Sequence, residues 1–134
     1  MNFRPVAAIA AVLAVSACAS APASYHGVTI TTPTPGQTVS SPFQVEGVTP
    51  DGWRYFEAIF SAQLIDGSGR VLAEAPAQAQ TDWMTPGPKP FVAQFRYQSA
   101  TAQAATVVLT EDDTGESPTP PRQIRISVML TPSR

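Results

Sequence analysis

Residues 123–130 of the chain read QIRISVML, and this stretch decides the fold class. Its Ile, Ile, Val and Leu side chains stand at every second position, beginning with Ile124. Because successive side chains of a β-strand point to opposite faces, this spacing predicts a strand with one buried face. Residues 91–98, FVAQFRYQ, alternate in the same way and predict a second strand of this kind.

The rest of the chain divides into similar short runs that end in turn residues. Counting outward from the two clear strands, we expect about seven strands, near residues 28–32, 43–48, 53–65, 71–72, 91–98, 104–110 and 124–130. Residues 53–65 (WRYFEAIFSAQLI) also fit a helical stripe, but their aromatic content and the Asp66-Gly67 hairpin signal that follows favour a strand. Seven strands with one apolar face each predict an all-β fold, an immunoglobulin-like antiparallel β-sandwich over residues 28–131.

The composition excludes several other classes of protein. Fourteen prolines and eight glycines in 134 residues exclude a coiled coil or a helical bundle, because proline costs about 3 kcal/mol inside a helix. A net charge of −2 lacks the basic character that nucleic-acid binding requires. One cysteine excludes a disulfide framework, and one histidine excludes a multi-histidine metal site.

The sequence carries no residue pattern typical of catalysis or of a cofactor site. The single histidine, His26, lies before the predicted sandwich, and no Gly-x-Ser-x-Gly nucleophile motif is present. The acidic run at residues 111–116 lacks the ligand spacing of a calcium-binding EF-hand loop. We therefore expect no enzyme activity, no catalytic residue, no metal and no cofactor.

The first 17 residues predict a signal peptide. Arg4 is followed by ten apolar residues at positions 6–15 (VAAIAAVLAV). Ten residues are enough to engage a secretion channel, but about 20 are needed to span a hydrocarbon core of about 30 Å. We expect this segment to be removed from the mature protein.

Residues 15–18, Val-Ser-Ala-Cys, resemble the lipobox of bacterial lipoproteins. The resemblance implies that the Cys18 thiol carries a diacylglycerol, that a peptidase cuts before it, and that the protein is anchored in a membrane. Ala19 stands where lipoproteins kept at the inner membrane often carry Asp, so the resemblance implies the outer membrane, facing the periplasm. The alternative is an ordinary secretory signal peptide in which the cysteine is incidental.

Residues 18–27 are expected to form a flexible tether between the anchor and the sandwich. After the cysteine they read ASAPASYHG, which is small, polar and without hydrophobic periodicity. Fully extended, this stretch reaches at most about 30 Å, so the domain would stay close to its membrane.

Three aromatic residues are candidates for contact with a ligand or partner: Trp53, Tyr55 and Trp83. Exposed aromatic rings can stack on sugars or anchor a protein partner. In a strand over residues 53–65, Trp53 and Tyr55 point to the face opposite to that of Phe56 and Phe60. Phe56 and Phe60 are expected on the buried face, so Trp53 and Tyr55 are predicted to face the surface. The alternative is that the tryptophans fill the core or cover an end of the sandwich.

A family resemblance emerges from the order of these features along the chain. The residues that carry it are Ile30, Pro33, Gly36, Val39, Ser41, Pro42, Val45, Gly47, Trp53, Phe56, Glu57, Leu64, Asp66, Gly69, Phe91, Ile126 and Val128. Over about residues 28–130 the chain resembles the immunoglobulin-like domain of bacterial spore germination proteins, a domain often found beside a GerMN domain and also alone in lipoproteins. The resemblance implies a β-sandwich on an exported protein and no catalytic residues. The chain has no room for a GerMN domain, which argues against a role in germination.

The sequence therefore predicts a lipid-anchored, non-catalytic binding module of the bacterial cell envelope. We expect it to dock an envelope protein through a face or an edge of the sandwich. The alternative is a carbohydrate-binding module that holds peptidoglycan or an exported polysaccharide, which would expose its aromatic rings in a row.

Overall fold

The structure is a computed structural model, and it describes residues 23–134. These residues form nine β-strands and no helix, so the predicted all-β fold is confirmed. The strands are β1 (Ala23–Tyr25), β2 (Val28–Thr32), β3 (Gln37–Val39), β4 (Phe43–Thr49), β5 (Ile59–Asp66), β6 (Val71–Ala79), β7 (Lys89–Phe95), β8 (Gln103–Thr110) and β9 (Gln123–Leu130). It follows that this part of the chain offers no helix with which to cross a membrane.

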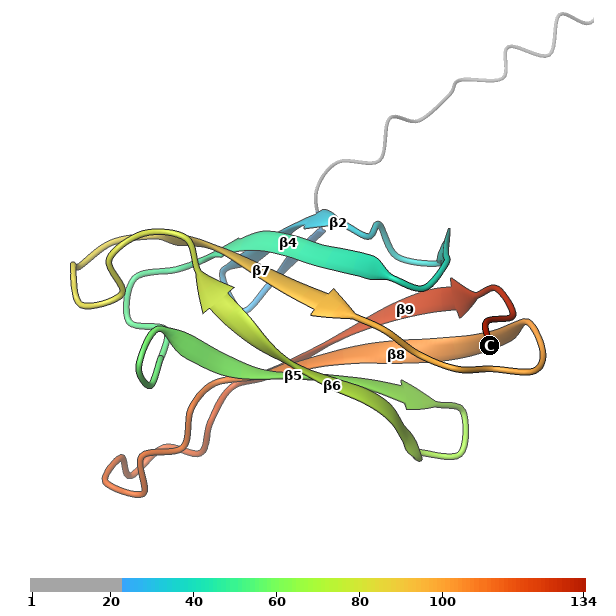
Figure 1. The fold of residues 1–134 in the computed structure, drawn as a ribbon. Coiled ribbons are helices and arrows are strands. Elements are labelled where there is room, and N and C mark those ends of the chain that lie inside the picture. Colours follow the sequence, from blue (N-terminus) through green and yellow to red (C-terminus); the bar gives the residue numbers. More distant parts are fainter. Residues whose placement is uncertain (1–22) are drawn as a thin grey trace, which may run out of the picture.

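The strands pair in the order β1-β2-β4-β7-β6-β5-β8-β9-β3. They form two layers, β1-β2-β4-β7 and β5-β8-β9-β3, with β6 passing from one layer to the other (Figure 1). Strand β6 pairs with β5 along most of its length and with β7 only at Gln78 and Ala79. The two layers are thus joined along this side by one short ladder and lie face to face elsewhere.

One strand pair departs from the predicted antiparallel arrangement. Strand β3 runs parallel to β9, with Gln37 opposite Val128 and Val39 opposite Leu130, whereas every other strand pair of the described chain is antiparallel. Between β2 and β3 the chain passes from one layer to the edge of the other without reversing direction. Gly36, with a φ of +79°, donates its N–H to the carbonyl of Ser127 at 2.7 Å and fixes this crossing.

The sheet begins earlier in the chain than the sequence predicts. Residues 23–27 fall in the expected tether, but Ala23–Tyr25 form β1 and pair with β2. The turn between the two strands is His26-Gly27, whose φ angles of +49° and +82° suit a two-residue hairpin. The predicted signal peptide and the first residues of the predicted tether lie outside the described residues.

The predicted strand over residues 53–65 is only half present. Strand β5 starts at Ile59, and the residues before it form a connection that ends in a tight turn. In contrast, the short strand predicted at residues 71–72 continues to Ala79 as β6. Pro76 is tolerated inside β6 because most of this strand pairs on one side only.

The core lies between the two layers and is built from the alternating positions of the strands. Its largest fully buried side chains include Phe91, Phe95, Leu64, Leu109 and Ile126. In β9 every second residue is buried, as the alternation in QIRISVML predicts.

An aromatic cluster closes one end of this core. The ring of Phe60 meets Trp53, Tyr55 and Phe91 edge to face, with centroids 5.0 to 5.5 Å apart. The end of the sandwich that carries this cluster is where the loops described next converge.

Candidate functional site

Three long connections gather at one end of the sandwich, which we call the loop end (Figure 1). They are residues 50–58 between β4 and β5, residues 80–88 between β6 and β7, and residues 111–122 between β8 and β9. Backbone groups tie them together. Asp112 donates its N–H to the carbonyl of Arg54 at 3.1 Å, and Gly87 donates its N–H to the carboxylate of Asp51 at 2.9 Å.

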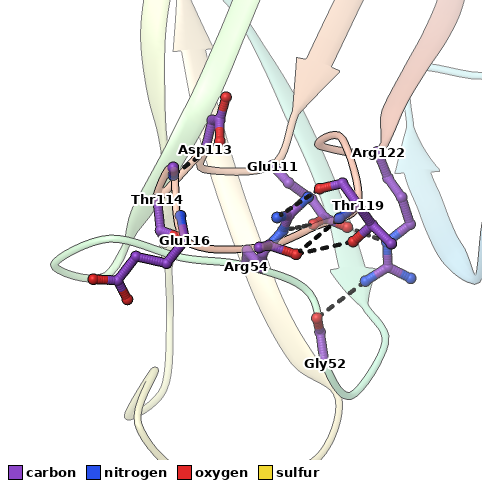
Figure 2. A network of polar contacts seen from close by, with 10 residues as sticks. Gly52, Arg54, Glu111, Asp113, Thr114, Glu116, Thr119 and Arg122 are labelled. Carbon is purple, nitrogen blue, oxygen red and sulfur yellow. Dashed lines mark hydrogen bonds and ion pairs between the residues drawn. The ribbon is translucent and has the colours of Figure 1, made fainter.

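A buried carboxylate holds two of these loops in place. Glu111 follows β8 directly and accepts hydrogen bonds from two guanidinium groups, Arg54 Nε at 2.5 Å and Arg122 Nε (Figure 2). Arg54 also donates to the carbonyl of Thr119, at 3.3 Å, and Arg122 to that of Gly52, at 3.1 Å. The side chain of Glu111 is only 2% exposed, so this ion-paired network is the rigid base of the loop end.

The same network supports the aromatic cluster beneath the loops. The guanidinium of Arg122 lies over the ring of Trp53, 5.2 Å from its centroid, in a cation–π contact. The Nε1 of Trp53 is buried and has no hydrogen-bond partner. The ring is therefore held by packing and by the charge above it.

Phe56 is the most exposed aromatic side chain at the loop end, with 56% of its surface accessible. It stands at the start of a tight turn closed by two backbone hydrogen bonds, from Phe56 N to Ile59 O at 2.9 Å and from Ile59 N to Phe56 O at 3.1 Å. The two residues inside the turn, Glu57 and Ala58, have φ angles of +49° and +70°. A left-handed conformation costs about 1–2 kcal/mol for a residue with a Cβ, so packing holds this turn against its local preference.

Phe56 borders two adjoining hollows of about 400 and 490 Å³, which we call together the Phe56 groove. The first hollow has an apolar floor that includes Ile59, Ala75 and Pro76. Four carboxylates line the two hollows, and no basic side chain does: Glu74, Asp112, Asp113 and Glu116. The groove therefore combines apolar contact area with a negative rim.

Comparison with known protein families identifies the domain that carries this groove. Residues 27–117 match the family model described as the immunoglobulin-like domain of bacterial spore germination. The chain belongs to this family. The predicted resemblance and the predicted immunoglobulin-like fold are thus confirmed, and an immunoglobulin-like domain of this kind indicates a non-catalytic binding module. Neither curated proteins nor solved structures gave a match.

The immunoglobulin-like domain buries two of the three aromatic residues that the sequence marked as candidates. Trp53 is only 5% exposed and Tyr55 only 8%, so the expectation that both face the surface is wrong. The turn at Glu57-Ala58 interrupts the strand expected from residue 53 and resets the alternation of its side chains. Phe56, expected to face inward, faces out for the same reason.

The structure nevertheless brings the three predicted aromatics together. Trp53, Tyr55 and the half-buried Trp83 line one pocket of about 390 Å³ at the loop end, beside Met84 and Thr114. Met84 is 76% exposed, whereas Trp83 packs against the core. The alternative stated from sequence, that the tryptophans fill or cover an end of the core, describes Trp53 fully and Trp83 in part.

The hydroxyl of Tyr55 serves the interior of the domain. It lies 2.6 Å from the Thr49 hydroxyl, which in turn donates to the carbonyl of Lys89 at 3.2 Å. Burial raises the pKa of Tyr55 above its usual value of 10.0, and the hydrogen bond with Thr49 partly offsets that rise. The phenol is therefore neutral at physiological pH and acts as a structural hydrogen-bonding group.

The predictions about a metal site, His26 and Cys18 concern residues outside this aromatic cluster. Within residues 23–134, no group of three or more His, Cys, Asp and Glu side chains could hold a metal ion. His26 lies in the β1–β2 turn. Cys18, the predicted lipidation site, lies outside the described residues.

Proposed function

We propose that the chain is a lipid-anchored binding module of the bacterial cell envelope, which catalyses no reaction and docks a protein partner at its loop end. The observation that carries this proposal is the Phe56 groove. It offers an exposed aromatic ring on a fixed turn, next to an apolar floor and a rim of carboxylates. Membership of an immunoglobulin-like family supports the non-catalytic part of the proposal.

The side chains exposed at the loop end favour a protein as the partner. Phe56, Ile59 and Met84 are the large apolar residues exposed there, and aromatic residues and methionine are enriched in protein interfaces. The carboxylates around them would select a partner with basic side chains beside its apolar ones. The Glu111 network keeps the surface rigid, which lowers the entropy cost of binding.

The glycan alternative has less support at this site. A sugar-binding surface would present a row of exposed rings, but Trp53 and Tyr55 are buried and Trp83 is half-buried. The exposed side chains therefore favour a protein as the partner. Glycan binding is the alternative result of the docking test.

The docking site can be tested by photocrosslinking in intact envelopes. A photoreactive phenylalanine analogue in place of Met84 is expected to capture one discrete protein. The substitution Phe56→Ala in the same chain should lower the yield about tenfold or more, because buried aromatic anchors carry much of an interface's binding energy. The matched control is Met129→Ala, which removes an exposed apolar side chain on β9 and should leave the yield unchanged.

Two results would contradict docking at the loop end. One is the absence of any discrete crosslinked protein, and the other is an equal yield for the Phe56→Ala chain and the parent. If muropeptides or polysaccharides changed the tryptophan fluorescence of the protein while crosslinking captured no protein, the glycan alternative would replace the proposal.

The anchor is a separate part of the proposal and rests on the lipobox resemblance at residues 15–18. Each acyl chain contributes about 0.8 kcal/mol per buried methylene, and two or more chains give stable anchoring. The absence of Asp after the cysteine supports an outer-membrane address that faces the periplasm.

The substitution Cys18→Ala is expected to move the protein from the membrane fraction to the soluble fraction. Immunoblots of fractionated cells, before and after a high-salt wash, measure this shift. Ser16→Ala, which keeps a small residue before the cysteine, is the control and should leave the protein in the membrane fraction. Salt-resistant membrane pelleting of the Cys18→Ala protein would overturn the anchor.

A further inference from the structure

The charges of the domain are divided between its two ends. Seven of the ten acidic residues lie at the loop end: Asp51, Glu57, Asp82, Glu111, Asp112, Asp113 and Glu116. The basic groups there are engaged locally. Arg54 and Arg122 pair with Glu111, and the Lys89 ammonium donates to the carbonyl of Gly87 at 3.0 Å. The rim of the Phe56 groove thus keeps a negative charge.

The opposite end of the sandwich carries a pocket of the opposite sign, which we call the arginine pocket. It measures about 570 Å³ and is lined by Arg70, Arg96 and Arg134 around Val71 and Leu72, with no acidic side chain among its lining residues. Its place follows from the topology. Arg70 lies between β5 and β6 and Arg96 directly follows β7, so both stand at the end away from the long loops (Figure 1).

One of these arginines, Arg96, is available for a new partner. Arg70 is held by Asp66, with 3.6 Å between Nε and Oδ2. Among residues 23–134, no carboxylate forms an ion pair with Arg96, whereas the guanidinium of Arg134 shares its residue with an α-carboxylate. Val71 is itself 44% exposed, so one accessible apolar side chain lies among the basic and polar side chains of the pocket.

We propose that the Phe56 groove of one copy binds the arginine pocket of a second copy, head to tail. This inference rests on the proposed docking function and names the partner as the same chain. The Phe56 groove has an apolar floor beside its carboxylates, and the arginine pocket sets the exposed Val71 among basic side chains, so each surface offers both apolar and charged contacts to a partner. Their rims have opposite signs, so the two ends attract each other whereas two like ends repel.

Such an interface joins two different surfaces and leaves one of each free. It therefore extends into an open row of molecules unless a rotation closes it into a ring. Ala23, the first described residue, pairs opposite Ile30 in the middle of β2, so it lies along the side of the sandwich and not at either end.

Crosslinking between two differently tagged full-length copies in intact envelopes tests the inference. The probe copy carries the photoreactive residue in place of Met84, and the target copy carries none. Crosslinks between the two tags are expected. Asp113→Arg in the probe copy should reduce them at least tenfold, and so should Arg96→Glu in the target copy, because each places like charges face to face.

Combining these substitutions separates this interface from a general charge effect. Asp113→Arg in the probe copy together with Arg96→Glu in the target copy restores opposite charges and should recover most of the yield. Arg96→Glu in the probe copy alone is the matched control. Its arginine pocket does not face the target at the probed contact, so the yield should stay unchanged.

The outcomes distinguish this inference from the docking function beneath it. If the probe captures a different discrete protein and never the second copy, self-association is wrong and docking at the loop end stands. If it captures no protein at all, both fail. Crosslinks between copies that ignore both charge reversals would also overturn the head-to-tail arrangement.

Discussion

The substitution Phe60→Ala is expected to lower the free energy of unfolding by about 4 kcal/mol. The Phe60 ring is buried where the two layers meet, and it touches Trp53, Tyr55 and Phe91 edge to face. Its loss removes the apolar burial of the ring and leaves a cavity that three aromatic neighbours cannot fill. Urea denaturation followed by tryptophan fluorescence measures the change.

Phe56→Ala is the matched control, because it removes the same side chain four residues earlier in the chain. Phe56 is largely exposed, so its removal should change the stability by less than about 0.5 kcal/mol. If Phe60→Ala prevents folding altogether, the milder Phe60→Leu is expected to cost about 1–2 kcal/mol. Equal losses of stability for Phe56→Ala and Phe60→Ala would contradict the burial of Phe60 and the exposure of Phe56.

The substitution Glu111→Gln is expected to destabilise the domain by about 3 kcal/mol. It keeps the size of the side chain but leaves the guanidiniums of Arg54 and Arg122 facing each other without the carboxylate between them. The two arginines keep some solvent contact, which places the loss at the lower end of the range for a broken buried ion pair. The midpoint of urea denaturation should fall while its slope stays the same.

Glu74→Gln is the control for this change. Glu74 is exposed on β6 and accepts one hydrogen bond, from Gln63 Nε2 at 2.9 Å, so its neutralisation should cost no more than about 0.5 kcal/mol. Limited proteolysis gives a second readout, since the loop at residues 111–122 should be cut faster in the Glu111→Gln protein. A loss below about 1 kcal/mol with unchanged proteolysis would show that the network does not hold the loop end.

The clearest strands could be predicted because their alternation continues without interruption. Strand β9 buries every second residue, and the core positions of β7 follow from the same pattern. The fold class and the family were therefore within reach of the sequence. Strands β1 and β3 were missed because three residues are too few to show a period.

The candidate site was only partly predictable, because its key feature is a turn that the sequence does not announce. Tight turns with two positive φ angles usually contain Asn-Gly or Asp-Gly, whereas this one contains Glu57-Ala58. The turn inverts the phase of the residues before it, so Trp53 and Tyr55 become core residues and Phe56 becomes a surface residue. The position of Glu111 between two arginines is equally hidden, since its partners lie 57 and 11 residues away in the chain.

Strand β1 has a consequence for how far the domain can search its surroundings. With Ala23 fixed in the sheet, five peptide steps separate it from Cys18. If Cys18 carries the proposed anchor, the connection to the sheet reaches at most about 17 Å, against about 30 Å for the spacer expected from sequence. Because the volume within reach scales with the cube of this length, it is then about one-fifth of the volume that a reach of about 30 Å allows. In that case the domain would meet molecules close to the plane of the membrane more readily than molecules deeper in the compartment.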